Sequence, residues 1–482
     1  NNFVNNISVV VIDVQKMELI GYLGNILSPQ NTSENYVDIA QAKRSTGSTL
    51  KPFLYGMMLT DGTKIKTSLL YDIPISYRGF RPQNYSKKFL GLVSFQDALT
   101  QSLNLPAVTL LGEYGVARFK DELKKIGFHS INQSAQHYGL SLILGGAECS
   151  LFDLTAAYAL LANSVGNEKA FKGNIKFGNN LQSDHIYQLP STISLFSAYQ
   201  ILEILSNVNR PREEDGWKLF SGSKKVAWKT GTSFGHRDAW AVGVNGKYAV
   251  GVWVGNATGE GRPLLTGVDS AAPILFDVFR LLPKSKWFEM PYNDLDPVEV
   301  CELSGYLAQE HCPKIKQWIP KTAKKTDNCP YHKIIHLDKN QQFRVNSNCE
   351  SVDEMVAKSW FVLPPVMEWY YKSKNVNYQN LPPFRSDCVD ALQDKRMDFI
   401  YPKANTKIIL TKDFESKLQP AIIKVAHSNS DAELFWYLDD KYVGNTKTFH
   451  EKPIFATTGF HVITVVDEFG NEIRRKVQFE SE

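Results

Sequence analysis

The stretch Asp238-Ala-Trp-Ala-Val-Gly-Val-Asn-Gly-Lys-Tyr-Ala-Val-Gly-Val-Trp-Val254 contains two apolar, β-rich runs on either side of Asn245-Gly246. Asn-Gly is the dipeptide that most strongly indicates a tight hairpin, because both turn positions need a positive φ. A third run of the same kind, Val226–Thr232, comes just before. The sequence therefore predicts three consecutive antiparallel strands.

Working outward, two more strand-like runs lie near the start of the chain, at Ser8–Asp13 and Glu18–Leu23, and their short separation predicts a hairpin. Helical spacing follows at Ser48–Leu59 and continues from about residue 96 to 163. Five strands from two ends of one region, with helices between them, predict an α+β fold over residues 1–285. We expect an antiparallel five-stranded sheet with flanking helices and a helical subdomain.

The composition and periodicity of the chain change at about residue 286 and again at about residue 401. Residues 286–400 are rich in Pro, Cys and aromatic side chains and show little sustained periodicity, which predicts an irregular connector. Residues 401–482 predict a small β-sandwich, because short alternating runs recur there at 407–410, 421–426, 433–438, 461–466 and 472–479. This division agrees with the roughly three domains expected for 482 residues.

Charge and hydropathy exclude several classes of protein. The net charge is +4 and is spread along the chain, whereas nucleic-acid binding shows as a concentrated basic patch, so no nucleic-acid partner is expected. The longest apolar runs are well short of the ~18 residues that span a bilayer. The N-terminus has no charged or apolar leader region, so we expect a fragment or processed form whose targeting segment lies upstream.

Three short motifs carry the candidate chemistry: Ser48-Thr-Leu-Lys51, Ser102-Leu-Asn104 and Lys229-Thr-Gly231. The first sets a hydroxyl and an amine on one face of a helix start, and a lysine activates a serine only when it is unprotonated. Each motif alone has a structural alternative, and Ser221-Gly-Ser-Lys224 repeats the first pattern. The three motifs occur together in this order, and each lies in the predicted helix, helical region or strand where the chemistry needs it. This combination favours the catalytic interpretation.

In this order the motifs resemble those of the penicilloyl serine transferases, the superfamily of penicillin-binding proteins and serine β-lactamases. Longer stretches resemble the transpeptidase domain of class A penicillin-binding proteins, namely Arg44–Tyr55, Ser102–Val108, Leu142–Glu148 and Lys229–Trp240. The connector and tail resemble the 1C type. The resemblance implies the penicilloyl serine transferase fold and an Ig-like C-terminal β-sandwich. Family members also carry a membrane anchor and a glycosyltransferase domain upstream, and we expect neither within these 482 residues.

The resemblance implies a peptidoglycan D,D-transpeptidase that crosslinks stem peptides through a serine acyl-enzyme formed on D-Ala-D-Ala, and that β-lactam antibiotics inhibit covalently. Ser48 would attack, Lys51 would take its proton, and the backbone N–H groups of Ser48 and Thr232 would form the oxyanion hole. Ser102 would pass a proton to the departing D-alanine. Asn104 would orient Lys51 and the substrate amide.

The third motif would bind the substrate. Lys229 would keep Lys51 neutral through like-charge repulsion and, with Thr230 and Thr232, would bind the terminal carboxylate. Gly231 would let the substrate backbone lie against the strand. Four residues just beyond the motif either line the cleft or form a loop salt bridge and a core Trp: His236, Arg237, Asp238 and Trp240.

Five of the six cysteines fall within ninety residues, which suggests disulfides in an oxidising compartment or a metal site. We expect disulfides between Cys301 and Cys312 and between Cys349 and Cys388. Cys149 is expected to pack as a small apolar residue.

A metal site is the less favoured alternative. The nearest set of ligands is Cys301, Cys312, Cys329 and His332, in which only the last two are closely spaced, so zinc is not expected and Cys329 is predicted to stay a thiol. The sequence predicts no cofactor.

Two other functions remain open. A D,D-carboxypeptidase or serine β-lactamase would use the same acylation and pass the acyl group to water, although Ser-Leu-Asn and the two further domains argue against the lactamase. A non-catalytic β-lactam sensor or scaffold would use the C-terminal domain to recruit a periplasmic protein. In each case the implied location is the periplasm, with a tether to the bacterial inner membrane outside this chain.

Overall fold

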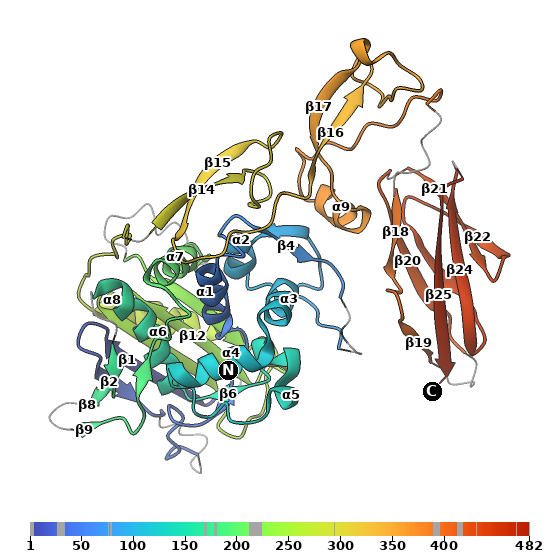
Figure 1. The fold of residues 1–482 in the computed structure, drawn as a ribbon. Coiled ribbons are helices and arrows are strands. Elements are labelled where there is room, and N and C mark those ends of the chain that lie inside the picture. The colour runs from blue at the N-terminus through green and yellow to red at the C-terminus, as the bar shows by residue number, and fades with distance from the viewer. Residues whose placement is uncertain are drawn as a thin grey trace. The chain divides into compact units, whose positions relative to one another are not determined.

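The computed structural model describes residues 4–26, 34–75, 77, 80–167, 171–177, 181–211, 224–293, 295–388, 396–411, 418–429, 431–468 and 470–481 (Figure 1). By their internal contacts they form two compact units. The first comprises Asn1–Leu70, Ser94–Leu307 and Lys314–Asp327, and the second comprises Tyr71–Val93, Ala308–Pro313 and Asn328–Glu482. Among the described residues, no helix combines the length and the apolar character that crossing a membrane requires.

A mixed sheet forms the centre of the first unit (Figure 1). Its strand order is β11-β12-β13-β1-β2-β8-β9. The strands are β1 (Asn6–Asp13), β2 (Glu18–Leu23), β8 (Lys176–Phe177), β9 (Leu181–Gln182), β11 (Ala227–Thr232), β12 (Asp238–Val244) and β13 (Tyr248–Gly255). The five predicted strands are confirmed as neighbours in antiparallel register.

The prediction of a five-stranded antiparallel sheet is wrong at one edge, where the sheet continues beyond β2. The strands β8 and β9 extend it to seven, and β8 pairs with β2 in parallel. Both added strands are two residues long, too short for an alternating pattern to reveal them.

The turn between β12 and β13 also differs from expectation. Neither Asn245 nor Gly246 has a positive φ. Instead, Asn245 Oδ1 accepts hydrogen bonds from the backbone N–H groups of Lys247 at 2.9 Å and Tyr248 at 2.8 Å. The Asn side chain therefore shapes the turn. The glycine is needed for space, because a Cβ on Gly246 would lie 2.3 Å from the carbonyl oxygen of Lys286.

Helices cover both faces of this sheet. The helix α8 (Ala272–Leu281) packs on one face over a core that includes Trp228 and Phe276, whose ring centroids lie 5.1 Å apart. The helix α6 (Leu151–Gly166) packs on the opposite face, where Gly251 of β13 lets it approach closely. The glycine-containing strand and the small side chains of α6 thus allow the sheet to be buried on both sides.

Serine caps start several of the other helices. In α2 (Phe95–Thr100), α5 (Ala135–Tyr138), α6 and α7 (Leu195–Ser206), the preceding serine accepts a backbone N–H three residues ahead. The remaining elements of this unit are α1 (Lys51–Asp61), α3 (Asn104–Tyr114), α4 (Val116–Ile126), the 3-10 helix η1 (Gly139–Leu144), the π-helix η4 (Gly267–Ala271), and the short strands β3 (Arg44–Ser45), β6 (Glu148–Cys149), β7 (Lys172–Gly173) and β10 (Tyr187–Gln188).

The predicted irregular connector contains regular structure. Two antiparallel hairpins occur in it, β14 (Leu295–Cys301) with β15 (Lys314–Pro320), and β16 (His332–Leu337) with β17 (Val356–Phe361). Their strands are joined by the long connections 302–313 and 338–355, so no tight-turn dipeptide marks them in the sequence. Other elements near these hairpins or at the unit boundary are β4 (Leu69–Asp72), β5 (Gly91–Ser94), η5 (Val352–Glu354) and α9 (Pro365–Lys372).

The C-terminal region consists of two sheets that share one apolar core, which includes Phe399, Trp436 and Val465. The five predicted strands are present, and β18, β22 and β23 are additional. One sheet has the order β18-β20-β23 and the other β19-β25-β24-β21-β22. Their bounds are β18 Met397–Tyr401, β19 Lys407–Leu410, β20 Ala421–His427, β21 Glu433–Leu438, β22 Lys441–Lys447, β23 Glu451–Ile454, β24 Gly459–Asp467 and β25 Glu472–Ser481.

One of the two expected disulfides is confirmed. Cys349 and Cys388 are bonded, with their Cα atoms 5.0 Å apart. The expected bond between Cys301 and Cys312 is wrong, since both residues are buried thiols. Spacing in the sequence does not fix which cysteines pair, because a disulfide also needs a specific Cα distance and side-chain orientation. Cys149 is buried, as predicted.

The contact between α6 and β13 gives a test of the core. A Cβ on Gly251 would lie 2.0 Å from Thr155 Oγ1 and 2.9 Å from Leu151 Cδ1, so Gly251→Ala must displace the helix. We expect a loss of about 1–3 kcal/mol and a melting temperature lowered by about 2 °C or more in calorimetry. The control is Gly166→Ala at the exposed end of α6, where nothing lies within 4 Å of the new Cβ. Equal melting temperatures for the two variants would contradict this packing argument.

Candidate active site

The first motif lies at the start of α1. Lys51 is the first residue of the helix and Pro52 the second, a position where proline is favoured because its missing N–H needs no partner. Ser48 lies in the turn just before, half-buried, and its carbonyl oxygen accepts the backbone N–H of Lys51 at 3.3 Å. The turn holds the serine hydroxyl and the lysine side chain at the same end of the helix.

The amine of Lys51 is completely buried and has three oxygen acceptors. Its Nζ donates to the carbonyl oxygens of Ser102 at 2.8 Å and Leu103 at 3.1 Å, and to Asn104 Oδ1 at 2.7 Å. All three acceptors come from the second motif. Burial, followed by the positive charge of Lys229, holds the pKa of Lys51 well below its usual range.

The third motif meets the second through a lysine–serine hydrogen bond. Lys229, on β11, is 2% exposed, and its Nζ donates to Ser102 Oγ at 2.7 Å and to the carbonyl oxygen of Thr230 at 2.8 Å. Burial lowers the pKa of Lys229 to about 7. Ser102 has a φ of +56°, in the left-handed region that costs a non-glycine residue ~1–2 kcal/mol. The structure thus brings all three motifs together around two buried amines.

Two glycines let the Ser48 turn pack directly on β11. Gly47, with a φ of +52°, is so close to the strand that a Cβ would lie 2.7 Å from the backbone nitrogen of Thr232. A Cβ on Gly231 would lie 2.7 Å from the carbonyl oxygen of Thr46. The glycine in Lys-Thr-Gly is therefore required by contact with the serine turn, which differs from the substrate contact expected from the sequence.

Other residues that hold the turn could not be recognised from the sequence. Trp240 Nε1 donates to the carbonyl oxygen of Ser45 at 2.8 Å, and Tyr158 OH, from α6, donates to that of Thr49 at 2.8 Å. On the far side of Thr232, its Oγ1 accepts the backbone N–H of Gly267 at 3.1 Å. Only tertiary contact gives these residues their role, so no local pattern signals it.

Of the four residues after the third motif, two are buried and two are not. Trp240 is 1% exposed, and Asp238 is buried, where its Oδ1 accepts from Trp253 Nε1 at 3.1 Å. Arg237 is exposed, and His236 Nδ1 lies 3.2 Å from the carbonyl oxygen of Leu265. The expected core Trp is confirmed, whereas cleft lining by His236 and Arg237 stays a prediction.

The lysine of the second Ser-x-x-Lys sequence, Lys224, has surroundings that differ from those of Lys51. Lys224 Nζ donates to the carbonyl oxygen of Phe279 at 2.6 Å and to that of Arg280 at 3.0 Å, in the last turn of α8. A lysine in this position favours a helix C-terminus, where carbonyl groups carry partial negative charge. Ser221 lies outside the described residues.

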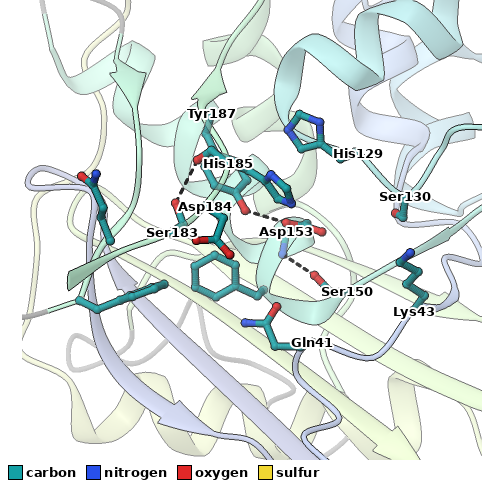
Figure 2. A pocket seen from close by; sticks show the side chains of 13 residues that line it. Gln41, Lys43, His129, Ser130, Ser150, Asp153, Ser183, Asp184, His185 and Tyr187 are labelled. Atoms are coloured by element: carbon teal, nitrogen blue, oxygen red, sulfur yellow. Dashed lines mark hydrogen bonds between the residues drawn. The ribbon is translucent and has the colours of Figure 1, made fainter.

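A separate cavity of about 340 Å³ lies in the same unit (Figure 2). Its labelled side chains include Asp153, which accepts from Tyr187 OH at 2.6 Å, and His129 and His185, whose ring centroids lie 4.2 Å apart. The residues that line it include none from the three motifs. This cavity is therefore not the candidate catalytic site.

The family described as "Penicillin binding protein transpeptidase domain" matches residues 7–269, more than half of the chain and all three motifs. The chain belongs to this transpeptidase family. A second family, "Penicillin-Binding Protein C-terminus Family", matches residues 386–479. These two matches agree with the resemblance to class A penicillin-binding proteins of the 1C type.

Individual relatives support the same assignment. The chain is 28% identical to penicillin-binding protein 1C of Escherichia coli (strain K12), over 97% of this chain and 60% of that protein. It is 29% identical to penicillin-binding protein 1A of Neisseria meningitidis serogroup A, over 53% of this chain and 33% of that protein. The chain thus spans about 60% or less of the length of these relatives.

A solved structure supports the fold. Penicillin-binding protein 1A from Haemophilus influenzae aligns with a TM-score of 0.51 and 18% identity, over 67% of this chain and 54% of that chain.

The buried lysines of this transpeptidase domain predict a pH-dependent stability. Lys229 has a folded pKa of about 7 against 10.5 unfolded, so between these values the unfolded chain holds more protons and stability rises with pH. Lys229→Met should flatten that rise by about 1.4 kcal/mol per pH unit. Urea midpoints between about pH 7.5 and pH 9.5 measure it.

The control is the exposed Lys172→Met, which should keep the wild-type slope. An unchanged slope in Lys229→Met would show that the Lys229 amine is charged in the folded protein above pH 7.

Proposed function

We propose that this chain carries out D,D-transpeptidation in peptidoglycan synthesis, crosslinking stem peptides through an acyl-enzyme that Ser48 forms on D-Ala-D-Ala. The observation that supports it most is the set of three oxygen acceptors around the buried Lys51 amine. Family membership supports the reaction class. The roles of individual residues follow from their geometry.

Acylation begins with a neutral Lys51, which its lowered pKa favours. Ser48 Oγ attacks the carbonyl carbon of the penultimate D-alanine while its proton passes to Lys51 Nζ. The proton taken from Ser48 Oγ lies on the side of Nζ that faces the nucleophile, and the other two hydrogens of the ammonium donate to acceptors among Ser102 O, Leu103 O and Asn104 Oδ1. These oxygens stabilise the protonated lysine that appears during the reaction more than they stabilise the neutral amine.

The serine turn and β11 supply the oxyanion hole under this proposal. The N–H groups of Ser48 and Thr232 stabilise the negative charge that develops on the carbonyl oxygen. The close approach of Gly47 to the backbone nitrogen of Thr232 supports this, because it brings the two chain segments to van der Waals contact beside the nucleophile. A side chain at position 47 would force them apart.

The Lys229–Ser102 hydrogen bond provides the proton for the leaving group. Ser102 Oγ gives its proton to the departing D-alanine nitrogen and is reprotonated from Lys229, whose pKa of about 7 suits exchange near neutral pH. Before it gives up this proton, charged Lys229 binds the substrate carboxylate together with Thr230 and Thr232. An amine from a second stem peptide then attacks the acyl-enzyme and passes a proton through Ser102 back to Lys229, while Lys51 returns its proton to Ser48 Oγ as the ester bond breaks.

The proposal extends to the setting of the enzyme. The substrates imply the periplasm, at the bacterial inner membrane, and β-lactam antibiotics are expected to acylate Ser48. The division into a transpeptidase domain (1–285), a connector (286–400) and a C-terminal Ig-like β-sandwich (401–482) stays a proposal, as does docking of a periplasmic protein by the last of these. No cofactor is needed for any step.

Substitution of the nucleophile tests the assignment. Ser48→Ala should lose all covalent labelling by a fluorescent penicillin, because the proposal makes Ser48 Oγ the atom that is acylated, and a gel-based assay measures it. The matched control is Ser221→Ala, from the second Ser-x-x-Lys sequence, which should label at the wild-type rate. Persistent label in Ser48→Ala would reject the proposed nucleophile.

The fate of the acyl-enzyme separates a transpeptidase from a hydrolase. We expect bound penicillin to leave over many minutes, since the acyl group waits for an amine acceptor, and only stoichiometric nitrocefin opening. Intact-protein mass spectrometry follows the acylated fraction with time. Continuous rapid nitrocefin turnover would instead identify a β-lactamase.

A further inference from the structure

The cavity of about 340 Å³ in the first unit has no part in the proposed reaction (Figure 2). All of the residues that line it belong to that one unit. Figure 2 shows Lys43 and Ser130 on one side of it, Ser183 and Asp184 on the opposite side, and Asp153 between them. The volume is within the range of cavities that bind a small ligand.

We propose that this cavity binds one sugar ring of the glycan strand of peptidoglycan, so that the stem peptide of the same strand reaches Ser48. The ligand class follows from the lining, which combines aromatic rings with hydrogen-bonding groups of both kinds. The identity of the glycan rests on the proposed function, because that function makes the glycan strand a part of the substrate.

Three aromatic side chains give the cavity an apolar wall. The ring centroid of Phe152 lies 5.5 Å from that of Phe177 and 6.3 Å from that of Tyr187, and both pairs meet edge-on. Gly127 makes room for this arrangement, because a Cβ there would lie 2.4 Å from Tyr187 Cδ1. The apolar face of a sugar ring presents C–H groups, which pack favourably on aromatic faces because those faces carry negative charge density.

The polar side chains of the lining offer hydrogen bonds in both directions. Tyr187 OH donates to Asp153 Oδ1 at 2.6 Å, so the second carboxylate oxygen of Asp153 remains to accept from a ligand. The ring centroids of His129 and His185 lie 4.2 Å apart, and burial, followed by the charge of His185, lowers the pKa of His129. A neutral imidazole offers one donor and one acceptor. Sugar hydroxyl groups, which also donate and accept, match this lining.

The charges of the lining favour a neutral ligand. Lys43 supplies one positive charge, whereas Asp153 and Asp184 supply two negative charges, so with neutral histidines the lining is negative overall. A phosphate or carboxylate ligand would therefore be disfavoured by like-charge repulsion. An N-acetylated sugar is uncharged, and its hydroxyl and amide groups use the same donors and acceptors.

Three serines hold the segments that form the walls. Ser130 Oγ donates to a carbonyl oxygen of β6 at 2.7 Å, and Ser150 Oγ accepts the backbone N–H of Asp153 at 3.0 Å. Ser183 Oγ donates to the carbonyl oxygen of His185 at 3.0 Å. The walls are thus fixed before a ligand enters, which lowers the entropy cost of binding.

The position of the cavity fits a strand whose stem peptide enters the catalytic site. Lys43 lies immediately before β3 and Ser150 immediately after β6, and these two strands pair with each other. Lys43 precedes Ser48 by five residues, so their Cα atoms are at most ~18 Å apart. An extended stem peptide of about five residues covers the same distance. A sugar in the cavity and a D-Ala-D-Ala end at Ser48 can therefore belong to one substrate molecule.

Binding of a peptide-free glycan to the full chain tests the proposal. The probe is a soluble tetramer of N-acetylglucosamine, followed by saturation-transfer nuclear magnetic resonance, and we expect a Kd of about 1 mM for the contacts of one ring. Protein acylated by penicillin should bind the probe equally well, because the cavity includes no residue of the three motifs. Absence of binding at about 10 mM probe, or loss of binding on acylation, would overturn the proposal.

Variants place the sugar in the cavity. Asp184→Ala removes an exposed acceptor and should weaken binding about fivefold, and Phe177→Ala, which removes part of the aromatic wall, should weaken it similarly. The matched control is Asp121→Ala, an exposed aspartate of α4 in the same unit, which should keep the wild-type affinity. Thermal melts followed by circular dichroism verify that each variant is folded.

Unchanged affinity in both cavity variants would refute the site, and binding of a free stem peptide without binding of the glycan would refute the ligand class. The measurement needs no turnover. It therefore succeeds or fails independently of the penicillin labelling of Ser48, which tests the proposed function.

Discussion

The burial of two lysine amines side by side is the constraint on which the catalytic unit depends. An isolated ammonium is costly to bury, and two near each other are costlier still. The fold lowers the pKa of both amines and surrounds them with oxygen acceptors from the backbone and from Asn104 and Ser102. This burial costs stability and favours a neutral Lys51 amine, which the proposed mechanism requires.

Close backbone contact is the second requirement, and glycine supplies it. Gly47 and Gly231 allow the serine turn to touch β11, and Gly145 packs against the same turn, with a Cβ there 2.9 Å from the nitrogen of Gly47. At each of these contacts a methyl group would separate the segments. Strand β11 therefore fixes where the serine turn packs, and a fixed placement of backbone N–H groups is what the proposed oxyanion hole requires.

The region between the two family matches follows a different principle. Its hairpins have partly exposed faces and a small core, and the region is crosslinked by the Cys349–Cys388 disulfide. A covalent crosslink stabilises a segment that has no large apolar core of its own. The C-terminal sheets, by contrast, share a continuous apolar core and need no such support.

Alternating and helical patterns in the sequence determined the five central strands, the main helices and five strands of the C-terminal sheets, because those patterns are local and long. The motif residues Ser48, Lys51, Ser102, Asn104 and Lys229 could likewise be named from their order and context. Short edge strands, the hairpins with long connections and the shape of the Asn245 turn could not, because a few residues carry too little periodicity.

Only the tertiary structure decided how the motifs act on one another. The three acceptors of Lys51 and the contact of Gly47 with Thr232 join residues far apart in the chain. The physical reason is the range of the interactions. A sequence records propensity and spacing over neighbouring residues, whereas pKa values and hydrogen-bond partners depend on groups that folding alone brings within a few ångströms.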